Sequence, residues 1–326
     1  MDKNLSELMK KQTIGVEVEM NHISRERASE VAAKYFGTGR HEYTGYSDGY
    51  DTYSAWDADG RKWKFCSDSS IDGPGVERCE LVTPILVYDD IYFLQGLVRE
   101  LRKAGARSDW SRCCGIHVHI GADGHTPQTL RNLANIMASH EDLLSDAIGI
   151  SPARAGYCRK ADPRFIEEVN KKKPRTMDGL ADVWYESQNC EWGRNQHYND
   201  SRYHILNLHA TFTKGTIEFR CFQFDTPSGD KRNGIHAGHL KAFIQFCLAV
   251  SNYAKVVRYA SPKAPAATTE NPKYVMRFWL KSMGMIGDEF KTARDYFLEK
   301  LDGNSDCRTG DRANCDHREA VVEFAA

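Results

Sequence analysis

The chain has no long hydrophobic run and almost no net charge. Its most apolar stretch, residues 242–250, is far shorter than a bilayer span and contains Gln245. The first residues, 1–11, are polar and lack the apolar core of a secretion signal. With 44 Lys and Arg against 45 Asp and Glu, the formal net charge is -1, which disfavours wholesale binding to nucleic acid or membrane surfaces. We therefore expect a cytoplasmic protein with no membrane partner and with nucleic acid disfavoured as a ligand.

Two common phosphate-binding loops are also missing. Neither Gly-x-x-x-x-Gly-Lys-Ser/Thr nor Gly-x-Gly-x-x-Gly occurs, so any nucleotide must be held in another way. The ten cysteines are scattered, and the adjacent Cys113 and Cys114 cannot easily form an ordinary disulfide. Cys307, Cys315 and His317 have no recognised zinc spacing. Free thiols in a reducing compartment are the favoured interpretation.

The 326 residues, 41% of them hydrophobic, are sufficient for a full core in one large domain or two ordinary ones. Strands interleaved with helices that can all cover one sheet face favour an α+β fold over a doubly wound parallel sheet. We place a boundary near residue 260, before a helical extension and polar tail at 261–326. Periodicity predicts helices at 24–36, 91–105, 126–149, 235–257 and 274–301. Alternation predicts strands at 14–20, 76–82 and 115–121, a hairpin at 52–65, and two strands within 202–224 joined at a turn at 214–215.

Three of these strands place ionisable side chains two residues apart within apolar alternation. The pairs are Glu17 and Glu19, His117 and His119, and Glu218 and Arg220. Side chains at i and i+2 share one face of a strand, so each pair projects together while its apolar neighbours face a core. Burying carboxylates is costly unless they are paired or bind metal, and Arg220 is the only cation paired with them. The pattern predicts a divalent-metal site.

Taken alone, each pair has an ordinary explanation. The glutamates could be solvated acids on an edge strand, the histidines could be hydrogen-bonded core residues, and the third pair could be a cross-strand ion pair. Their joint occurrence favours the metal site. Glu80, which precedes Leu-Val-Thr-Pro at a strand end, joins the group; Glu77 would lie on the opposite face, and we prefer Glu80 as the inward ligand.

A set of four carboxylates and one histidine suits Mg²⁺ or Mn²⁺ better than zinc, because hard oxygen ligands match hard cations. Such sites commonly serve phosphate chemistry, in which metals bridge phosphate oxygens and an arginine stabilises the developing charge. ATP is therefore the expected nucleotide.

Five short motifs occur in a characteristic order. They are Gly-Val-Glu-Val-Glu, Glu-Leu-Val-Thr-Pro, Cys-Gly-Ile-His-Val-His-Ile, Arg-Tyr-His-Ile-Leu-Asn-Leu and Thr-Ile-Glu-Phe-Arg. In this order they resemble the amidoligase family, within the glutamine synthetase and glutamate-cysteine ligase superfamily of carboxylate-amine ligases. The resemblance implies a curved antiparallel sheet that forms an active-site cleft, with helices packed on its outer face. Residues 1–260 would form this glutamine synthetase-like catalytic domain, with 261–326 packed on it.

The resemblance also implies ATP and two or three Mg²⁺ or Mn²⁺ ions, and it assigns roles to individual residues. The implied metal ligands are Glu17, Glu19, Glu80, His117 and Glu218. Glu218 and Arg220 are the implied catalytic residues, and Arg220 would contact the transferred phosphoryl group. The implied cofactor-binding residues are His117, Arg202 and Asn207. Arg154, which opens the basic stretch 154–175, is predicted as a further cofactor-binding residue. This stretch would be either a flap over phosphates or over an acidic substrate, or a solvated loop, and His119 would support His117 as an outer residue of the site.

The predicted activity is that of an ATP-dependent carboxylate-amine ligase that forms an amide through an acyl phosphate. The carboxylate could be a small molecule, a peptide or a protein, and the amine is equally open. A guanidino-type ATP phosphotransferase, a metal-dependent hydrolase and an inactive nucleotide-binding relative are the alternatives. An oligomer is possible, since the relatives range from monomers to rings.

Overall fold

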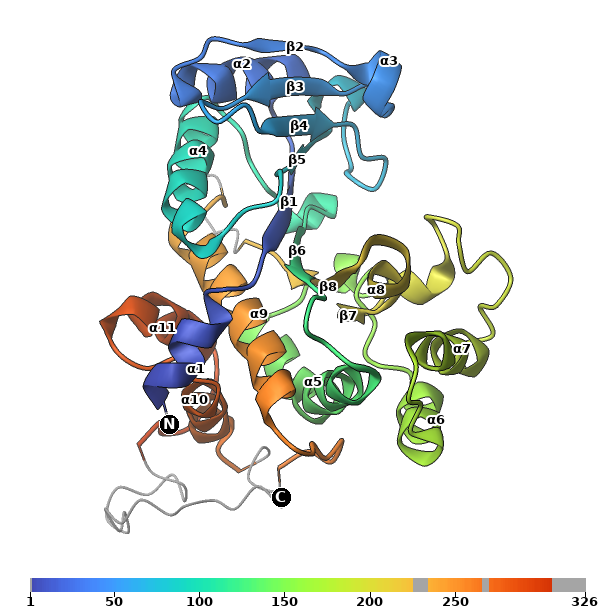
Figure 1. The fold of residues 1–326 in the computed structure, drawn as a ribbon. Coiled ribbons are helices and arrows are strands. Elements are labelled where there is room, and N and C mark those ends of the chain that lie inside the picture. The colour runs from blue at the N-terminus through green and yellow to red at the C-terminus, as the bar shows by residue number, and fades with distance from the viewer. Residues whose placement is uncertain (1, 225–233, 266–269, 307–326) are drawn as a thin grey trace.

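The computed structural model describes residues 2–224, 234–265 and 270–306. Within them, one open sheet has eight strands in the order β2-β3-β4-β5-β1-β6-β8-β7 (Figure 1), and every neighbouring pair is antiparallel. The sheet twists strongly, so that β3 and β4 run across Figure 1 while β1 runs down it. The strands are β1 (Ile14–Met20), β2 (His41–Tyr43), β3 (Tyr53–Trp56), β4 (Lys62–Cys66), β5 (Cys79–Val82), β6 (Ile116–Gly121), β7 (Leu206–Asn207) and β8 (Thr216–Phe222).

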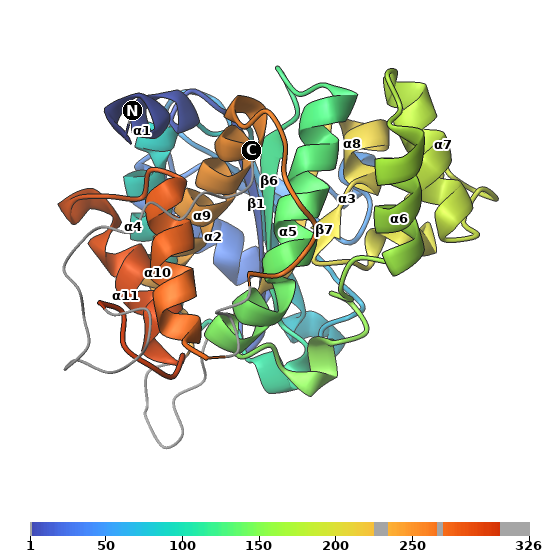
Figure 2. The same cartoon turned by 90° about the horizontal axis from the view of Figure 1, so that it is seen from below.

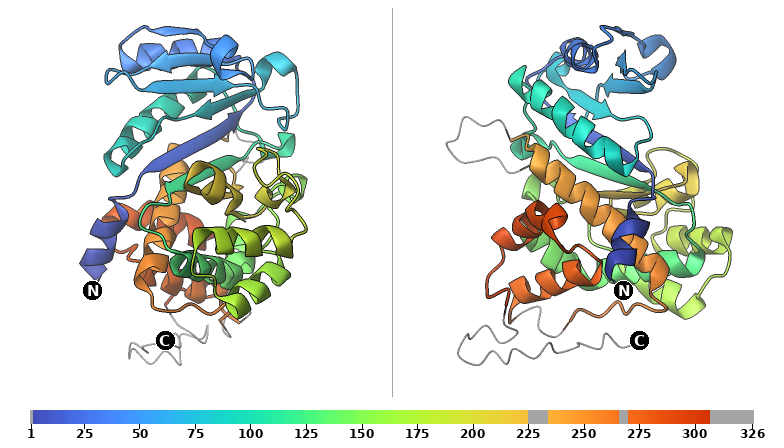
Figure 3. Two further views of the ribbon diagram at one scale, coloured as in Figure 1. Left: turned by 45° about the vertical axis from the view of Figure 1, so that its right-hand side comes forward. Right: turned by 60° about the vertical axis from the view of Figure 1, so that its left-hand side comes forward.

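Helices from distant parts of the chain cover this sheet. Helix α2 packs on β2 to β5, α9 packs on β6, and α4 contacts both of these helices. Figure 3 shows α2, α4 and α9, in blue, teal and orange, following one another along the sheet. The helices are α1 (Asp2–Met9), α2 (Arg25–Phe36), α3 (Gly45–Asp48), α4 (Ile91–Lys103), α5 (Pro127–Ile148), α6 (Pro163–Lys172), α7 (Met177–Ser187), α8 (His209–Lys214), α9 (Ala237–Val256), α10 (Pro272–Ser282) and α11 (Lys291–Glu299).

The alternation in β1 shows why the sheet has two different faces. Val16 and Val18 are buried in the hydrophobic core, whereas Glu17 and Glu19 project from the opposite face. The predicted antiparallel sheet with packed helices is thus confirmed. The glutamine synthetase-like topology and its cleft remain predictions.

Most predicted elements are confirmed, together with their local signals. Ser24 caps α2 by accepting a hydrogen bond from the Arg27 N–H, and Thr126 caps α5 by accepting one from the Thr129 N–H. The hairpin is present as β3 and β4. Of the predicted strand at 76–82, only β5 is extended, and a 3₁₀ turn at Gly75–Glu77 precedes it.

Two predictions were wrong in detail. The pair of strands within 202–224 is interrupted by helix α8, because the Asn207 side chain accepts a hydrogen bond from the Ala210 N–H and so turns the chain after only two extended residues. The single helical segment at 274–301 is two helices, α10 and α11. Between them Gly284 and Gly287 have φ angles of 86° and 87°, a conformation that L side chains rarely adopt and that ends a helix.

The C-terminal helices pack on the rest of the molecule. Helices α10 and α11 contact α5, and α11 also contacts α9, whereas α6 and α7 lie on the other side of α5 (Figure 2). The domain boundary at residue 260 stays a prediction, and the predicted polar tail lies outside the described residues from 307 onward. No helix in the described part of the chain combines the length and the apolar character that crossing a membrane requires.

Candidate metal and nucleotide site

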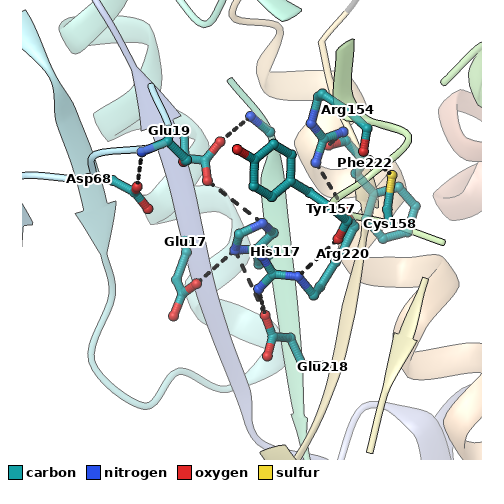
Figure 4. A network of polar contacts seen from close by, with 12 residues as sticks. Glu17, Glu19, Asp68, His117, Arg154, Tyr157, Cys158, Glu218, Arg220 and Phe222 are labelled. Carbon is teal, nitrogen blue, oxygen red and sulfur yellow. Dashed lines mark hydrogen bonds and ion pairs between the residues drawn. The ribbon is translucent and has the colours of Figure 1, made fainter. Parts of the chain in front are cut away.

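Strand register brings the predicted acidic residues together. Neighbouring strands β5, β1, β6 and β8 carry them, and Glu80 lies opposite Glu19 in the β5–β1 pair. Glu17 lies opposite His117 between β1 and β6. Residues directly opposite one another in an antiparallel pair share a face, so all of these side chains project from the side of the sheet that faces away from the core. Figure 4 shows Glu17, Glu19 and Glu218 around the His117 ring.

The imidazole of His117 lies between two groups of carboxylates. Its Nδ1 is 2.8 Å from Glu17 Oε2 and 3.8 Å from Glu218 Oε1. Its Nε2, on the other side of the ring, is 3.7 Å from Glu19 Oε1. Because an ionised carboxylate can only accept, the contact with Glu17 places the ring proton on Nδ1. The lone pair of Nε2 then faces Glu19.

Both groups have the composition of a metal site. Ligand atoms of Glu17, His117 and Glu218 lie within 4.8 Å of one another, and so do those of Glu19, Glu80 and His117. Carboxylate oxygens with one imidazole nitrogen fit Mg²⁺ or Mn²⁺. A neutral imidazole has one lone pair, and the tautomer set by Glu17 directs it to the group that contains Glu80. Residues of this chain could therefore hold two ions, with His117 as a ligand to the second.

Glu218 is held by two donors. Arg220 Nη1 donates to its Oε1 at 2.5 Å, and Asn207 Nδ2 donates to its Oε2 at 2.6 Å. Burial would raise the pKa of Glu218, but the nearby Arg220 and His119 lower it to about 2. The predicted nucleotide-binding residue Asn207 thus orients a carboxylate in this structure.

Glu80 has the opposite character. Burial raises the pKa of its carboxyl group well above the ordinary value, and the charges of Glu17, Asp68 and Glu19 raise it further. Its side chain makes no ion pair with a basic side chain in the described ranges. Glu77 lies on the 3₁₀ turn before β5 and belongs to neither carboxylate group, in agreement with the preference for Glu80 as the inward residue.

His119 lies beside the first group. Its Nδ1 is 3.1 Å from Thr216 Oγ1, and its Nε2 is 3.3 Å from Glu17 Oε1. Burial would lower the pKa of His119, but the charges of Glu17 and Glu218 outweigh it and raise the pKa. His119 thus contacts Glu17, and its predicted support of His117 stays a prediction.

The guanidinium of Arg220 is fixed on three sides. Besides the bond to Glu218, its Nε donates to the Tyr157 carbonyl at 3.4 Å, and its Cζ lies 5.7 Å from the centre of the Tyr203 ring. Nη2 makes no hydrogen bond with the described residues. The free N–H groups of Nη2 are therefore available to an anionic ligand.

The remaining predicted cofactor residues are placed differently. Arg202 donates from Nη1 to the His197 carbonyl at 3.1 Å and lies 5.5 Å and 5.7 Å from the ring centres of Tyr198 and Tyr203. Arg154 is buried, and its guanidinium donates to backbone carbonyls of β8. Neither arginine contacts the acidic residues directly, and their predicted nucleotide contacts stay predictions.

The basic stretch 154–175 mostly forms surface ion pairs. Lys171 and Lys172 both lie within ion-pair distance of Glu168, and Arg164 pairs with Asp162. These contacts favour a solvated surface for the lysines.

Three residues near the site had no role predicted from the sequence. Asp68, labelled in Figure 4, carries a charge that contributes to the raised pKa of Glu80. Tyr157 and Tyr203 hold Arg220. All three lie in connecting segments, where alternation gives no signal; the only hint for Asp68 was its position just after the end of β4.

Fold and site together define a class of protein: an antiparallel sheet whose open face carries a carboxylate-rich site of metal-binding type with a fixed arginine beside it. Comparison with known proteins is consistent with this. A family described as "Putative amidoligase enzyme" matches residues 10–251, and the chain belongs to this amidoligase family. Membership supports a ligase role.

None of the curated proteins matches the chain. Among solved structures it is similar to a bifunctional glutathione synthetase from Pasteurella multocida, with a TM-score of 0.46 and 10% identity. The similarity covers 91% of this chain and 48% of that one, so the chain spans about half the length of that protein.

Proposed function

We propose that the protein is an ATP-dependent carboxylate-amine ligase that works at a site with two divalent ions. The observation that carries the proposal is the convergence of Glu17, Glu19, Glu80 and Glu218 on His117, with Arg220 fixed beside them. Four carboxylates share this largely buried face, and Mg²⁺ or Mn²⁺ ions would add positive charge to that of Arg220 and His119 and would also bind the phosphates of ATP.

In the proposed reaction, a carboxylate oxygen of the substrate attacks the γ-phosphorus of ATP and the bond to the β-phosphate oxygen breaks. The products are ADP and an acyl phosphate. The amine nitrogen of the second substrate then attacks the acyl carbon, loses a proton and releases inorganic phosphate. Bound divalent ions would neutralise charge on the phosphates throughout.

The side chains of this protein contribute positioning and charge. Glu17, Glu19, Glu80 and Glu218 would hold the metal ions, and His117 would add a nitrogen ligand to the group that contains Glu80. The free Nη2 of Arg220 would contact the oxygens of the transferred phosphoryl group, and Asn207 keeps Glu218 oriented. Holding both reactants in line is the main catalytic effect in such a transfer.

An acyl phosphate can be trapped even when the natural amine is unknown. Purified protein would be incubated with Mg²⁺, ATP, hydroxylamine and a panel of carboxylates, including amino acids and short peptides. The proposal predicts a hydroxamate, with ADP and phosphate released in equal amounts and only when a suitable carboxylate is present. A stable phosphorylated acceptor would identify a phosphotransferase, turnover without ATP a hydrolase, and nucleotide binding without turnover across the panel an inactive relative.

The matched control for this assay is Arg220→Lys, which keeps the charge but loses the planar fork. We expect it to retain binding of Mg²⁺ and ATP and to lose turnover about 100-fold or more.

The eight cysteines in the described part of the chain are all free thiols, which supports our further proposal of a cytoplasmic location.

A further inference from the structure

Arg154 directs its guanidinium at the backbone of a neighbouring strand. It ends a short 3₁₀ turn, Pro152–Arg154, and is only 2% exposed. Its Nη1 donates to the carbonyl of Phe222 at 2.8 Å and reaches that of Cys221 at 3.5 Å. Its Nη2 donates to the carbonyl of Arg220 at 2.9 Å. One side chain therefore binds three consecutive carbonyls at the end of β8 (Figure 4).

The strand is irregular at this point. Ile116 of β6 lies opposite Phe222, but Val118 lies opposite Phe219, so two steps along β6 correspond to three along β8. Such a bulge inserts an unpaired residue and breaks the regular ladder of hydrogen bonds. A buried carbonyl left without a donor destabilises the fold. The rigid fork of Arg154 supplies donors to three carbonyls of this segment.

The irregular segment carries Arg220. A bulge changes the direction in which its side chains leave the strand, and Arg220 lies between the two registers. The side chain of Arg220 is held by the same neighbouring segment, because its Nε donates to the carbonyl of Tyr157. The Tyr157 N–H in turn donates to the carbonyl of Arg154 at 2.9 Å. Residues 154–157 thus fix both the backbone and the guanidinium of Arg220.

Gly115 leaves room for this arrangement. A Cβ atom at Gly115 would lie 2.1 Å from Nη2 of Arg154 and 2.5 Å from its Cζ. Any side chain at this position would displace the guanidinium from the carbonyls of β8. Gly115 therefore gives a second way to disturb the contact without changing Arg154.

We propose that Arg154 is a positioning residue: by holding the bulge in β8 it directs Arg220 toward the transferred phosphoryl group. This role differs from direct contact between Arg154 and the nucleotide. It rests on the proposed function, because the phosphoryl contact of Arg220 belongs to that function.

The test compares two complexes by calorimetry: Mg²⁺ with ADP, and Mg²⁺ with ADP and aluminium fluoride, which mimics the transferred phosphoryl group. The ratio of the two affinities measures the phosphoryl contact alone. The variants are Arg154→Met, Arg154→Lys, Gly115→Ala, Arg220→Gln and the double variant of Arg154→Met with Arg220→Gln. Arg99→Met, an exposed arginine on α4, is the matched control.

We expect Arg154→Met to lower this ratio about tenfold while the affinity for Mg²⁺ and ADP changes less than about twofold. Gly115→Ala should lower the ratio as well, together with the affinity for Mg²⁺ and ADP, because the Gly115 N–H donates to Glu19. Arg154→Lys should recover part of the ratio, and Arg99→Met should keep all of it. In the Arg220→Gln background, Arg154→Met should cause no further loss, because it acts through Arg220. Equal loss for both complexes in Arg154→Met, or additive effects in the double variant, would overturn the proposal. If Arg154→Met does not fold, Arg154→Lys carries the same comparison.

A wild-type protein that binds neither complex would contradict the proposed function rather than the positioning role alone. Crystal structures of wild type and Arg154→Lys then decide the positioning role without any ligand. A shifted β8 register and a displaced Arg220 guanidinium support it, and an unchanged Arg220 refutes it.

Discussion

The carboxylates on the two sides of His117 differ in how their charge is neutralised. On one side, Glu17 and Glu218 meet His119 and Arg220. On the other side, Glu19 accepts a hydrogen bond from the N–H of Gly115 at 2.5 Å. Glu80 lies opposite Glu19 in the strand register and forms no ion pair with a basic side chain among the residues that the structure describes. The protein itself largely neutralises the charge on the first side. A bound cation would therefore neutralise more uncompensated charge on the second side, at Glu19 and Glu80.

The pKa values of the carboxyl groups also differ between the two sides of His117. Burial raises the pKa of both Glu218 and Glu80, but Arg220 and His119 reverse the effect at Glu218, while the charges of Glu17 and Asp68 reinforce it at Glu80. The metal-free protein should therefore take up protons at Glu80 first. We infer that a divalent ion at Glu19 and Glu80 replaces those protons when it binds.

The largest expected effect comes from breaking the neutralised side. Glu218→Ala leaves the buried Arg220 without its carboxylate, so the free energy of unfolding of the metal-free protein should fall by about 3–5 kcal/mol. Urea unfolding measures the loss. Glu168→Ala is the control, since its partners Lys171 and Lys172 are at the surface, and it should cost less than about 1 kcal/mol. Equal losses for the two variants would contradict the role of Glu218 as a counter-charge.

The two sides should also respond to pH in opposite directions in protein treated with a chelator. The pKa of Glu218 is below its ordinary value of 4.5, so its stabilisation is present above that value and is lost as pH falls toward about 2. The loss is on the order of 3 kcal/mol. The pKa of Glu80 is raised, so its contribution is present at low pH and is lost as pH rises above 4.5.

Urea unfolding of wild type, Glu218→Gln and Glu80→Gln across this range measures both slopes. Relative to wild type, Glu218→Gln should have a lower free energy of unfolding and Glu80→Gln a higher one. Both differences should become smaller as the pH falls, because a protonated glutamate resembles glutamine. A gain of Glu80→Gln that grows as the pH falls would show that the assignment of the two sides is wrong.

Removing the charge of Glu80 should stabilise the metal-free protein. Glu80→Gln relieves repulsion with Glu19 directly opposite, which should add roughly 1 kcal/mol to the free energy of unfolding. Glu17→Gln is the matched comparison and should destabilise, because the histidines beside Glu17 lower its pKa. Added Mn²⁺ should raise the melting temperature of wild type and have much less effect on Glu80→Gln. If both substitutions changed the free energy of unfolding of the metal-free protein in the same direction, the distinction between the two sides would be wrong.

Asp68 should have the smallest effect. Asp68→Asn keeps the acceptor for the Ser70 N–H, at 2.7 Å, and removes one of the charges that raise the pKa of Glu80. We expect a gain of about 0.5 kcal/mol in metal-free stability. In the Glu80→Gln background this gain should disappear, and a gain that persists there would show that Asp68 acts elsewhere.

Local alternation was sufficient to predict which side chains share the functional face. Glu17, Glu19, His117 and Glu218 follow from the two-residue period of strands, which needs no tertiary information. The division of the acids into two groups depends instead on which strands are neighbours, and the sequence does not state that register. Helix α8 was missed because Asn207 ends its strand through a side-chain hydrogen bond to the backbone.

The arginines were the hardest residues to assign. Arg154 was predicted as a cofactor residue because it opens a basic stretch, yet its guanidinium binds carbonyls of a strand more than sixty residues later. Those carbonyls belong to the segment of β8 that contains a bulge, and bulges leave no periodic signal. The roles of Tyr157 and Tyr203 were not predicted either, because contacts made by connecting segments depend on the folded chain.

The central claim, that the acids around His117 bind divalent ions, can be tested most directly by anomalous diffraction from crystals grown with Mn²⁺ and a non-hydrolysable ATP analogue. We expect a manganese peak within about 2.5 Å of carboxylate oxygens of both Glu19 and Glu80, with His117 Nε2 as a further ligand. A second peak is expected between Glu17 and Glu218. An ordered site with no manganese at Glu19 and Glu80, under saturating Mn²⁺ and nucleotide, would contradict it.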